Sequence, residues 1–163
     1  MIVHLLLLEI VKYRIESDFL GEMKIPSEAY YGIHTKRAMD NFPIAEVAIS
    51  VYPNIVIAYA MVKLACARAN NQLGLLDDDI YHPIVAACER IINGEFHDQF
   101  IVEIIQGGAG TSTNMNANEV IANVALEIIG KEKGDYDAIS PLGHVNMSQS
   151  TNDTYPTALL VGF

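Results

Sequence analysis

The apolar residues between residues 113 and 130 follow a helical spacing, since they recur at steps of three and four. The residues that share this spacing are Ile121, Val124, Ala125, Ile128 and Ile129. Gly130 comes next and is expected to end the helix. Lys131 and Lys133 follow the glycine, where the negative end of the helix dipole favours cations. The pattern therefore predicts a helix that begins near Thr113 and stops at Gly130.

Three further segments show helical patterns. Residues 54–73 are apolar nearly all round, so this helix is expected to be buried on several sides, with Asn54 as its cap and Gly74 as its stop. A second helix begins at the acidic turn Asp77–Asp79, which suits the positive end of a helix dipole, and ends near Gly94. The last helical stripe consists of Tyr155, Leu159, Leu160 and Phe163.

The first fifty residues show no long helical pattern. Gly21, Pro26 and Gly32 divide them into short pieces, which predicts a small irregular or β-hairpin segment at the N-terminus. Alternating charges in this segment are expected to form ion pairs without a chemical role. These charged residues are Arg14, Glu16, Asp18, His34 and Arg37. Residues 1–163 are therefore expected to form a single, mainly α-helical domain.

Two polar stretches interrupt the apolar pattern, and each leads into a predicted helix. Residues 107–116 and residues 144–153 are rich in small hydroxyl and amide side chains. Because free N–H groups at a helix start bind anions, both stretches are candidate carboxylate or phosphate sites. Ser150 and Asp153 have the spacing of a capping box, so helix capping alone is the alternative. A nucleotide loop is weakly indicated, because neither Gly-Lys-Ser/Thr nor a G-x-G-x-x-G after a strand is present.

Composition and charge narrow the function classes. The chain has 163 residues, 51% of them hydrophobic, and a mean hydropathy of +0.23, so part of its apolar surface is expected to be covered by another chain. The formal net charge of −10 argues against binding to nucleic acids or anionic membranes. The apolar run at residues 1–11 is too short to span a membrane and lacks the features of a signal peptide, which predicts a cytoplasmic protein.

Ligand spacing predicts no metal and no cofactor. The five histidines are scattered without an H-x-x-x-H pair. Asp77–Asp79 with His82 does not have the spacing of a calcium loop and is better explained as a helix start. Cys66 and Cys88 lie in alanine-rich helical patterns, so both are expected to be buried thiols.

Two long motifs in this chain are similar to those of a known enzyme superfamily. GGAGTSTNMNANEVIAN at residues 107–123 and HVNMSQSTNDTYPTAL at residues 144–159 resemble the aspartase/fumarase superfamily. Thr-Ser-Thr at residues 111–113, Ser-Thr-Asn-Asp at residues 150–153 and Tyr-Tyr-Gly-Ile-His-Thr at residues 30–35 look most like the aspartate ammonia-lyase branch. The resemblance covers the N-terminal third of such enzymes, before their central helical-bundle domain.

The resemblance implies a reaction and a set of site residues. Aspartate ammonia-lyases eliminate ammonia from L-aspartate to give fumarate through an aci-carboxylate intermediate, which needs hydrogen-bond donors where charge develops. Thr111, Ser150, Thr151 and Asn152 match the family's substrate-binding residues. The residues expected to shape the loops are Thr113, Asn114, Asn116 and His144.

The resemblance also implies what this chain does not supply. The family's catalytic base and histidine lie in later segments, so no catalytic residue is assigned here and the chain alone is expected to be inactive. His144 has a pKa range that suits a base, but a hydrogen bond that braces its loop is the favoured interpretation. Relatives form homotetramers whose sites combine several subunits, so a homo-oligomer is expected.

The sequence departs from the family pattern at two places, and two other functions stay open. Pro141-Leu142-Gly143 replaces a Pro-Asn-Asp run, and Val124 stands where relatives commonly have arginine. The first alternative is a non-catalytic helical module that self-associates through apolar helix faces. The second is a hydro-lyase of the fumarase type, which the residues at positions 30–35 and 150–153 disfavour.

Overall fold

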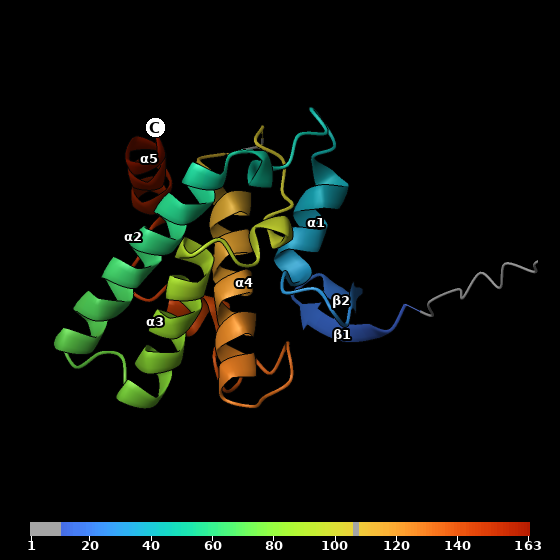
Figure 1. Cartoon of the computed structure of the whole chain (residues 1–163). Helices are drawn as coiled ribbons and strands as arrows, with labels where there is room; N and C mark the ends of the chain where they lie inside the picture. The colour runs from blue at the N-terminus through green and yellow to red at the C-terminus, as the bar shows by residue number, and fades with distance from the viewer. Residues whose placement is uncertain (1–10, 106–107) are drawn as a thin grey trace, which may run out of the picture.

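A computed structural model describes residues 11–105 and 108–163 of the chain (Figure 1). Residues 1–10 of the apolar N-terminal run and Gly107 of the first polar stretch lie outside the described residues. The described part is mainly helical and begins with a two-stranded antiparallel hairpin, which confirms the expected fold class. In chain order the elements are β1 (Tyr13–Asp18), β2 (Gly21–Pro26), α1 (Ile33–Asn41), η1 (Ile49–Val51), α2 (Pro53–Gln72), α3 (Asp78–Ile92), η2 (His97–Gln99), α4 (Thr111–Ile128), η3 (Pro141–Val145) and α5 (Thr151–Gly162).

Helix α4 lies at the centre of the fold. Figure 1 shows α2 and α3 on one side of it and α1 with the β1–β2 hairpin on the other, and α5 contacts both α2 and α4. Every residue from 113 to 126 is buried, so α4 is enclosed on all sides and not only along the predicted apolar stripe. Its buried polar side chains therefore need partners inside the protein. These side chains are Thr113, Asn114, Asn116, Asn118, Glu119 and Asn123.

The predicted ends of α2 and α3 are confirmed except for the cap of α2. Helix α2 begins at Pro53 with Tyr52 in the cap position, so the predicted Asn54 cap is wrong. Proline suits the first helical position, because the N–H group that it lacks would have had no partner there. Gly74 follows the end of α2 with a φ of +71°, and Asp78 and Asp79 occupy the first turn of α3, as expected.

The charged residues of the N-terminal segment form the expected ion pairs. Arg14 Nε donates to Glu16 Oε1 over 2.8 Å, and the Arg37 guanidinium binds both carboxylate oxygens of Asp18 at 2.7 Å. Arg14 also donates to the backbone carbonyls of Pro26, Ala29 and Tyr31. These bonds fasten the hairpin to the segment that leads into α1.

Helix α1 is capped by a carboxylate from α4. Glu119 is fully buried, and its two oxygens accept from the backbone N–H groups of Gly32 and His34 at 2.8 Å and of Thr35 at 3.1 Å. Glu16 accepts from the N–H of Ile33 at 2.8 Å, and burial raises the pKa of this carboxyl. Since α1 has no capping side chain of its own, its start depends on these two carboxylates.

The two cysteines occupy different environments. Cys88 is fully buried on α3 as expected, and burial raises the pKa of its thiol to about 12. Cys66 on α2 is only half-buried, so that part of the prediction is wrong. Among the described residues, no helix combines the length and the apolar character that a membrane span requires.

Candidate functional site

The first polar stretch forms the N-terminus of α4. Gly110 takes the cap position in the left-handed conformation with a φ of +82°, and no side chain caps the helix. Thr111 is exposed, Ser112 is half-buried and Thr113 is buried. These three residues form the first turn of α4, as the sequence predicts, and a first turn without a side-chain cap is suited to an anion.

The second polar stretch forms the N-terminus of α5. Ser150 is the N-cap, and its hydroxyl oxygen accepts from the N–H of Asn152 at 3.3 Å. The predicted capping box is wrong in detail, because the N–H of Asp153 donates to the backbone oxygen of Ser150 and not to its hydroxyl. Ser150 and Asn152 are exposed, and Thr151 is half-buried.

The two helix starts lie against each other. A Cβ atom placed on Gly110 would lie 2.1 Å from the ring of Tyr155, so the α4 cap rests directly on the first turns of α5. Thr154 Oγ1 on α5 donates to Asn114 Oδ1 on α4 over 3.2 Å. The structure therefore places the first turns of α4 and α5 against each other, and the dipoles of both helix N-termini favour negative charge.

A buried lysine on α2 forms hydrogen bonds with residues at both helix starts. Lys63 of α2 is fully buried, and its ammonium nitrogen Nζ donates to three amide oxygens. The acceptors are Asn114 Oδ1 at 2.7 Å, Gln149 Oε1 at 2.8 Å and Asn146 Oδ1 at 3.0 Å. Burial lowers the pKa of Lys63 to about 7. Lys63 thus connects the first turn of α4 with the residues that precede Ser150.

Lys63 is not among the residues that the sequence motifs indicated, although the sequence carries a signal for it. Lys63 is the single charged residue in the apolar run of residues 58–67, and a lone charge in a helix that is buried on several sides needs a specific partner. The partners come from segments about 50 to 90 residues further along the chain. Their identity could not be inferred from spacing within the helix.

Asn116 and His144 make hydrogen bonds that hold neighbouring segments. Asn116 Nδ2 donates to the carbonyl of Gln99 over 3.0 Å, and its Oδ1 accepts from the N–H of Val102 at 3.4 Å. His144 Nδ1 accepts from the N–H of Ser140 at 3.0 Å. Asn114 contacts Lys63 and Thr154 as described, and Thr113 is buried.

The two departures from the family pattern lie in different surroundings. Val124 is fully buried in the middle of α4, where its side chain belongs to the hydrophobic core. Leu142 is exposed in η3, a single wide turn that Ser140 caps by accepting from the N–H of Gly143 at 2.9 Å. The loop before α5 therefore closes without the Asn and Asp side chains of the family pattern.

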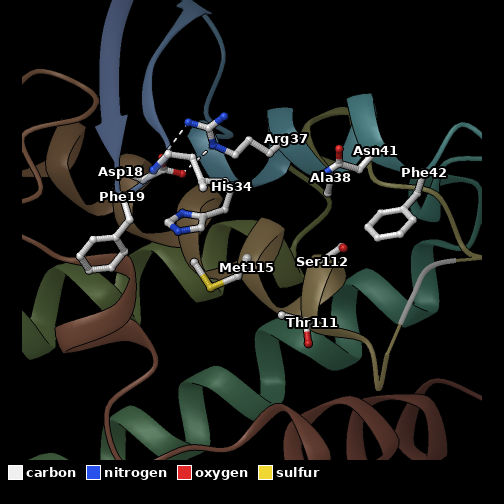
Figure 2. A pocket seen from close by; sticks show the side chains of 11 residues that line it. Asp18, Phe19, His34, Arg37, Ala38, Asn41, Phe42, Thr111, Ser112 and Met115 are labelled. Carbon is white, nitrogen blue, oxygen red and sulfur yellow. Dashed lines mark hydrogen bonds and ion pairs between the residues drawn. The ribbon is translucent and has the colours of Figure 1, made fainter.

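A largely apolar cavity borders the α4 start on the side away from α5. It measures about 330 Å³ and lies between the hairpin turn, α1 and α4 (Figure 2). Figure 2 shows the Asp18–Arg37 pair and His34 toward one end and Thr111 and Ser112 toward the other. The hydrogen bond to Glu119 raises the pKa of His34. Phe19, Phe42 and Met115 also line the cavity, so most of its wall is apolar.

The described residues contain no cluster of three or more His, Cys, Asp or Glu side chains arranged to hold a metal ion. Asp77–Asp79, which the sequence raised as a metal candidate, forms the start of α3. The donors at the two helix starts are hydroxyls and backbone N–H groups, and the Lys63 ammonium donates to amide oxygens beside them. Such donors bind anions, so the arrangement is suited to a carboxylate ligand.

A comparison with protein-family models decides the family. The model described as lyase matches residues 21–162, which is nearly all of the chain. The chain belongs to this lyase family. The resemblance to the aspartase/fumarase superfamily that the two motifs indicate is thereby confirmed.

Curated relatives of this lyase chain are named aspartate ammonia-lyase. The protein from Pseudomonas aeruginosa is 58% identical over 149 residues, which cover 91% of this chain and 31% of the relative. The protein from Bacillus subtilis is 55% identical over 148 residues, which cover 91% of this chain and 31% of the relative. The chain therefore spans about a third of the length of the curated relatives it matches.

Solved structures of related lyases share the fold. The fumarate lyase:delta crystallin from Brucella melitensis in native form is 55% identical, with a TM-score of 0.91 over 93% of this chain and 35% of that chain. A class II fumarase from Schistosoma mansoni is 35% identical, with a TM-score of 0.83 over 93% of this chain and 32% of that chain. The arrangement of the helices is thus common to relatives that carry different names.

Proposed function

We propose that this lyase chain is the part of an aspartate ammonia-lyase that binds the carboxylate groups of L-aspartate and of its product fumarate. The observation that carries the proposal is the pairing of two hydroxyl-rich helix starts above a buried cation. Thr111 at the α4 start and Ser150, Thr151 and Asn152 at the α5 start are the proposed substrate-binding residues. Thr113, Asn114, Asn116 and His144 are proposed to hold the two loops in place.

The proposed reaction begins when a base removes a proton from C3 of L-aspartate, and it ends when the C–N bond breaks and ammonia leaves. The intermediate between these steps carries two negative charges on one carboxylate group. Hydroxyls, backbone N–H groups and two helix dipoles stabilise such a charge when they are already in position. We propose that the base comes from outside these 163 residues, so this chain binds substrate but does not turn it over alone.

The proposal includes a homo-oligomer whose site combines several subunits. Supporting it, large apolar side chains are exposed near the end of α5 and on the neighbouring face of α2. Exposed apolar surface of this kind is typical of a face that another chain covers. These side chains are Met61, Leu160, Val161 and Phe163. We also propose a cytoplasmic location, where L-aspartate and fumarate are available.

A hydro-lyase of the fumarase type is the second candidate, because the Schistosoma mansoni class II fumarase shares the fold at 35% identity. Calorimetric titration with L-aspartate and with L-malate compares the two ligands on the same site. The proposed function predicts tighter binding of L-aspartate. Tighter binding of L-malate would support the hydro-lyase instead.

The role of the α5 start is tested with Ser150→Ala and the unreactive dicarboxylate succinate. The variant removes one hydrogen bond to a charged group, which contributes roughly 1.5–3 kcal/mol, so we expect succinate to bind about tenfold or more weakly in a calorimetric titration. Thr157→Ala is the matched control, since it removes a hydroxyl from the exposed surface of α5 away from the helix start. Equal affinities for the wild-type chain and Ser150→Ala would remove Ser150 from the site.

A further inference from the structure

Lys63 is a buried cation that has no carboxylate partner among residues 11–105 and 108–163. In the described residues its titratable neighbours are the thiols of Cys66 on α2 and Cys88 on α3, and it forms no ion pair. Asp153 in the first turn of α5 is exposed and belongs to the solvent side of the helix start. The whole chain carries a formal net charge of −10, so acidic residues are plentiful, yet none of the described ones forms an ion pair with Lys63. Buried ammonium groups are normally paired.

The hydrogen-bond geometry around Lys63 fits the protonated form. An ammonium group has three N–H donors and no acceptor, and Nζ faces three amide oxygens at 2.7–3.0 Å. The orientation of these amides is set by their own nitrogen atoms, since Asn114 Nδ2 donates to Asn146 Oδ1 and Gln149 Nε2 donates to the carbonyl of Val145. The site is therefore built to hold a charge that burial disfavours.

The hydrogen bonds of Lys63 reach residues at both helix starts. Asn114 belongs to the first turns of α4, and Gln149 immediately precedes the α5 cap Ser150. Two helix N-termini and an ammonium group all carry positive charge, so they oppose one another when no anion is present. A ligand with two carboxylates would offset this repulsion, because both helix N-termini and the ammonium group attract its negative charges.

We propose that a dicarboxylate bound at the α4 and α5 starts is the counter-charge of Lys63, so that ligand binding and protonation of Lys63 are coupled. The inference rests on the proposed function and adds a residue that acts without touching the ligand. Lys63 is a positioning residue: its hydrogen bonds hold Asn114, Asn146 and Gln149, and its charge acts on the ligand through them. At a pH where Lys63 of the free chain is deprotonated, binding of the dicarboxylate is therefore accompanied by the uptake of a proton by Lys63.

The coupling is tested on the wild-type chain by nuclear magnetic resonance. The ¹³Cε signal of Lys63 is titrated with pH, first without ligand and then with saturating succinate. In the free chain the midpoint is expected near 7, where burial places the pKa of Lys63. Succinate is expected to raise it by about one unit or more, which corresponds to a tenfold or larger gain in proton affinity. An unchanged midpoint in a chain that binds succinate would overturn the proposal.

Substitution gives an independent test by calorimetry. Lys63→Met keeps an unbranched, slightly shorter side chain and removes the charge, and Lys131→Met removes the same charge from the surface. We expect Lys63→Met to bind succinate about thirtyfold or more weakly. The proton uptake, measured at pH 8 in buffers of different ionisation enthalpy, is expected to disappear. Lys131→Met is expected to keep both the affinity and the proton uptake.

The outcomes separate the inference from the proposed function. If Ser150→Ala weakens succinate binding but Lys63→Met leaves affinity and proton uptake unchanged, the coupling is wrong and the anion site stands. If the wild-type chain does not bind succinate, the anion site and the coupling both fail. Should Lys63→Met not fold, the resonance titration of the wild-type chain decides by itself.

Discussion

Gly110→Ala is expected to destabilise the chain by roughly 3 kcal/mol. Gly110 has a φ of +82°, a conformation that costs a residue with a Cβ atom about 1 kcal/mol or more. The added Cβ would also lie 2.1 Å from the Tyr155 ring. Relieving this steric clash is expected to lower the free energy of unfolding by about 1–3 kcal/mol more. Urea unfolding followed by circular dichroism measures the loss. Because α4 is the central helix, we expect the whole transition to shift.

Gly130→Ala is the control for this prediction. Gly130 has a φ of +73° at the other end of α4, and no atom lies within 4 Å of its added Cβ. Gly130→Ala is expected to lower the free energy of unfolding by about 1 kcal/mol, which is the cost of the backbone conformation alone. Tyr155→Ala in the Gly110→Ala background should recover part of the difference. Equal losses at the two glycines would show that the α4 cap does not rest on α5.

Glu119→Gln is expected to destabilise the chain by about 3 kcal/mol. The two oxygens of Glu119 accept from three backbone N–H groups at the start of α1 and from His34 Nδ1. Glutamine offers one oxygen and places an NH₂ group against donors, so buried N–H groups lose their partner. Each bond to a charged acceptor contributes roughly 1.5–3 kcal/mol, and an unpaired buried donor adds to the cost. Urea unfolding gives the free energy of unfolding directly.

The same substitution at Glu127 is the control. Glu127 lies two turns later on α4, is partly exposed and contacts Tyr30 and Arg90 at the surface. Exposed pairs contribute about 0–1 kcal/mol, so Glu127→Gln should have little effect on unfolding. In Glu119→Gln the pKa of His34 should also fall, because the hydrogen bond to Glu119 is the main cause of its raised pKa. A stable Glu119→Gln protein with an unchanged His34 titration would contradict the proposed capping of α1.

The sequence predicted the elements of this fold because their signals are local. The spacing of apolar residues placed α4, and Gly74 and Gly130 marked helix ends that the structure confirms. The cap of α2 was missed for an equally local reason, since a proline at the first helical position outranks an asparagine one residue later. Local patterns thus describe where helices run and where they stop.

The contacts that build the candidate site are long-range, and the sequence could not supply them. Lys63 meets Asn114 and Gln149, which are 51 and 86 residues away along the chain. Glu119 caps a helix that lies 84 to 87 residues earlier. Each of these residues is polar within an apolar segment, which signals that a partner exists but not which one. Only the packing of α4 against its neighbours identifies the partner.

An amide resonance titration of the chain with succinate tests the proposed anion site most directly. If one dicarboxylate spans both helix starts, the N–H signals of Ser112 and Asn152 should shift together and give the same dissociation constant. The N–H signals at the start of α3, whose first turn carries Asp78 and Asp79 and is not preceded by a hydroxyl-rich loop, should stay in place. No shift at either helix start with saturating succinate, or shifts at only one of them, would contradict the account.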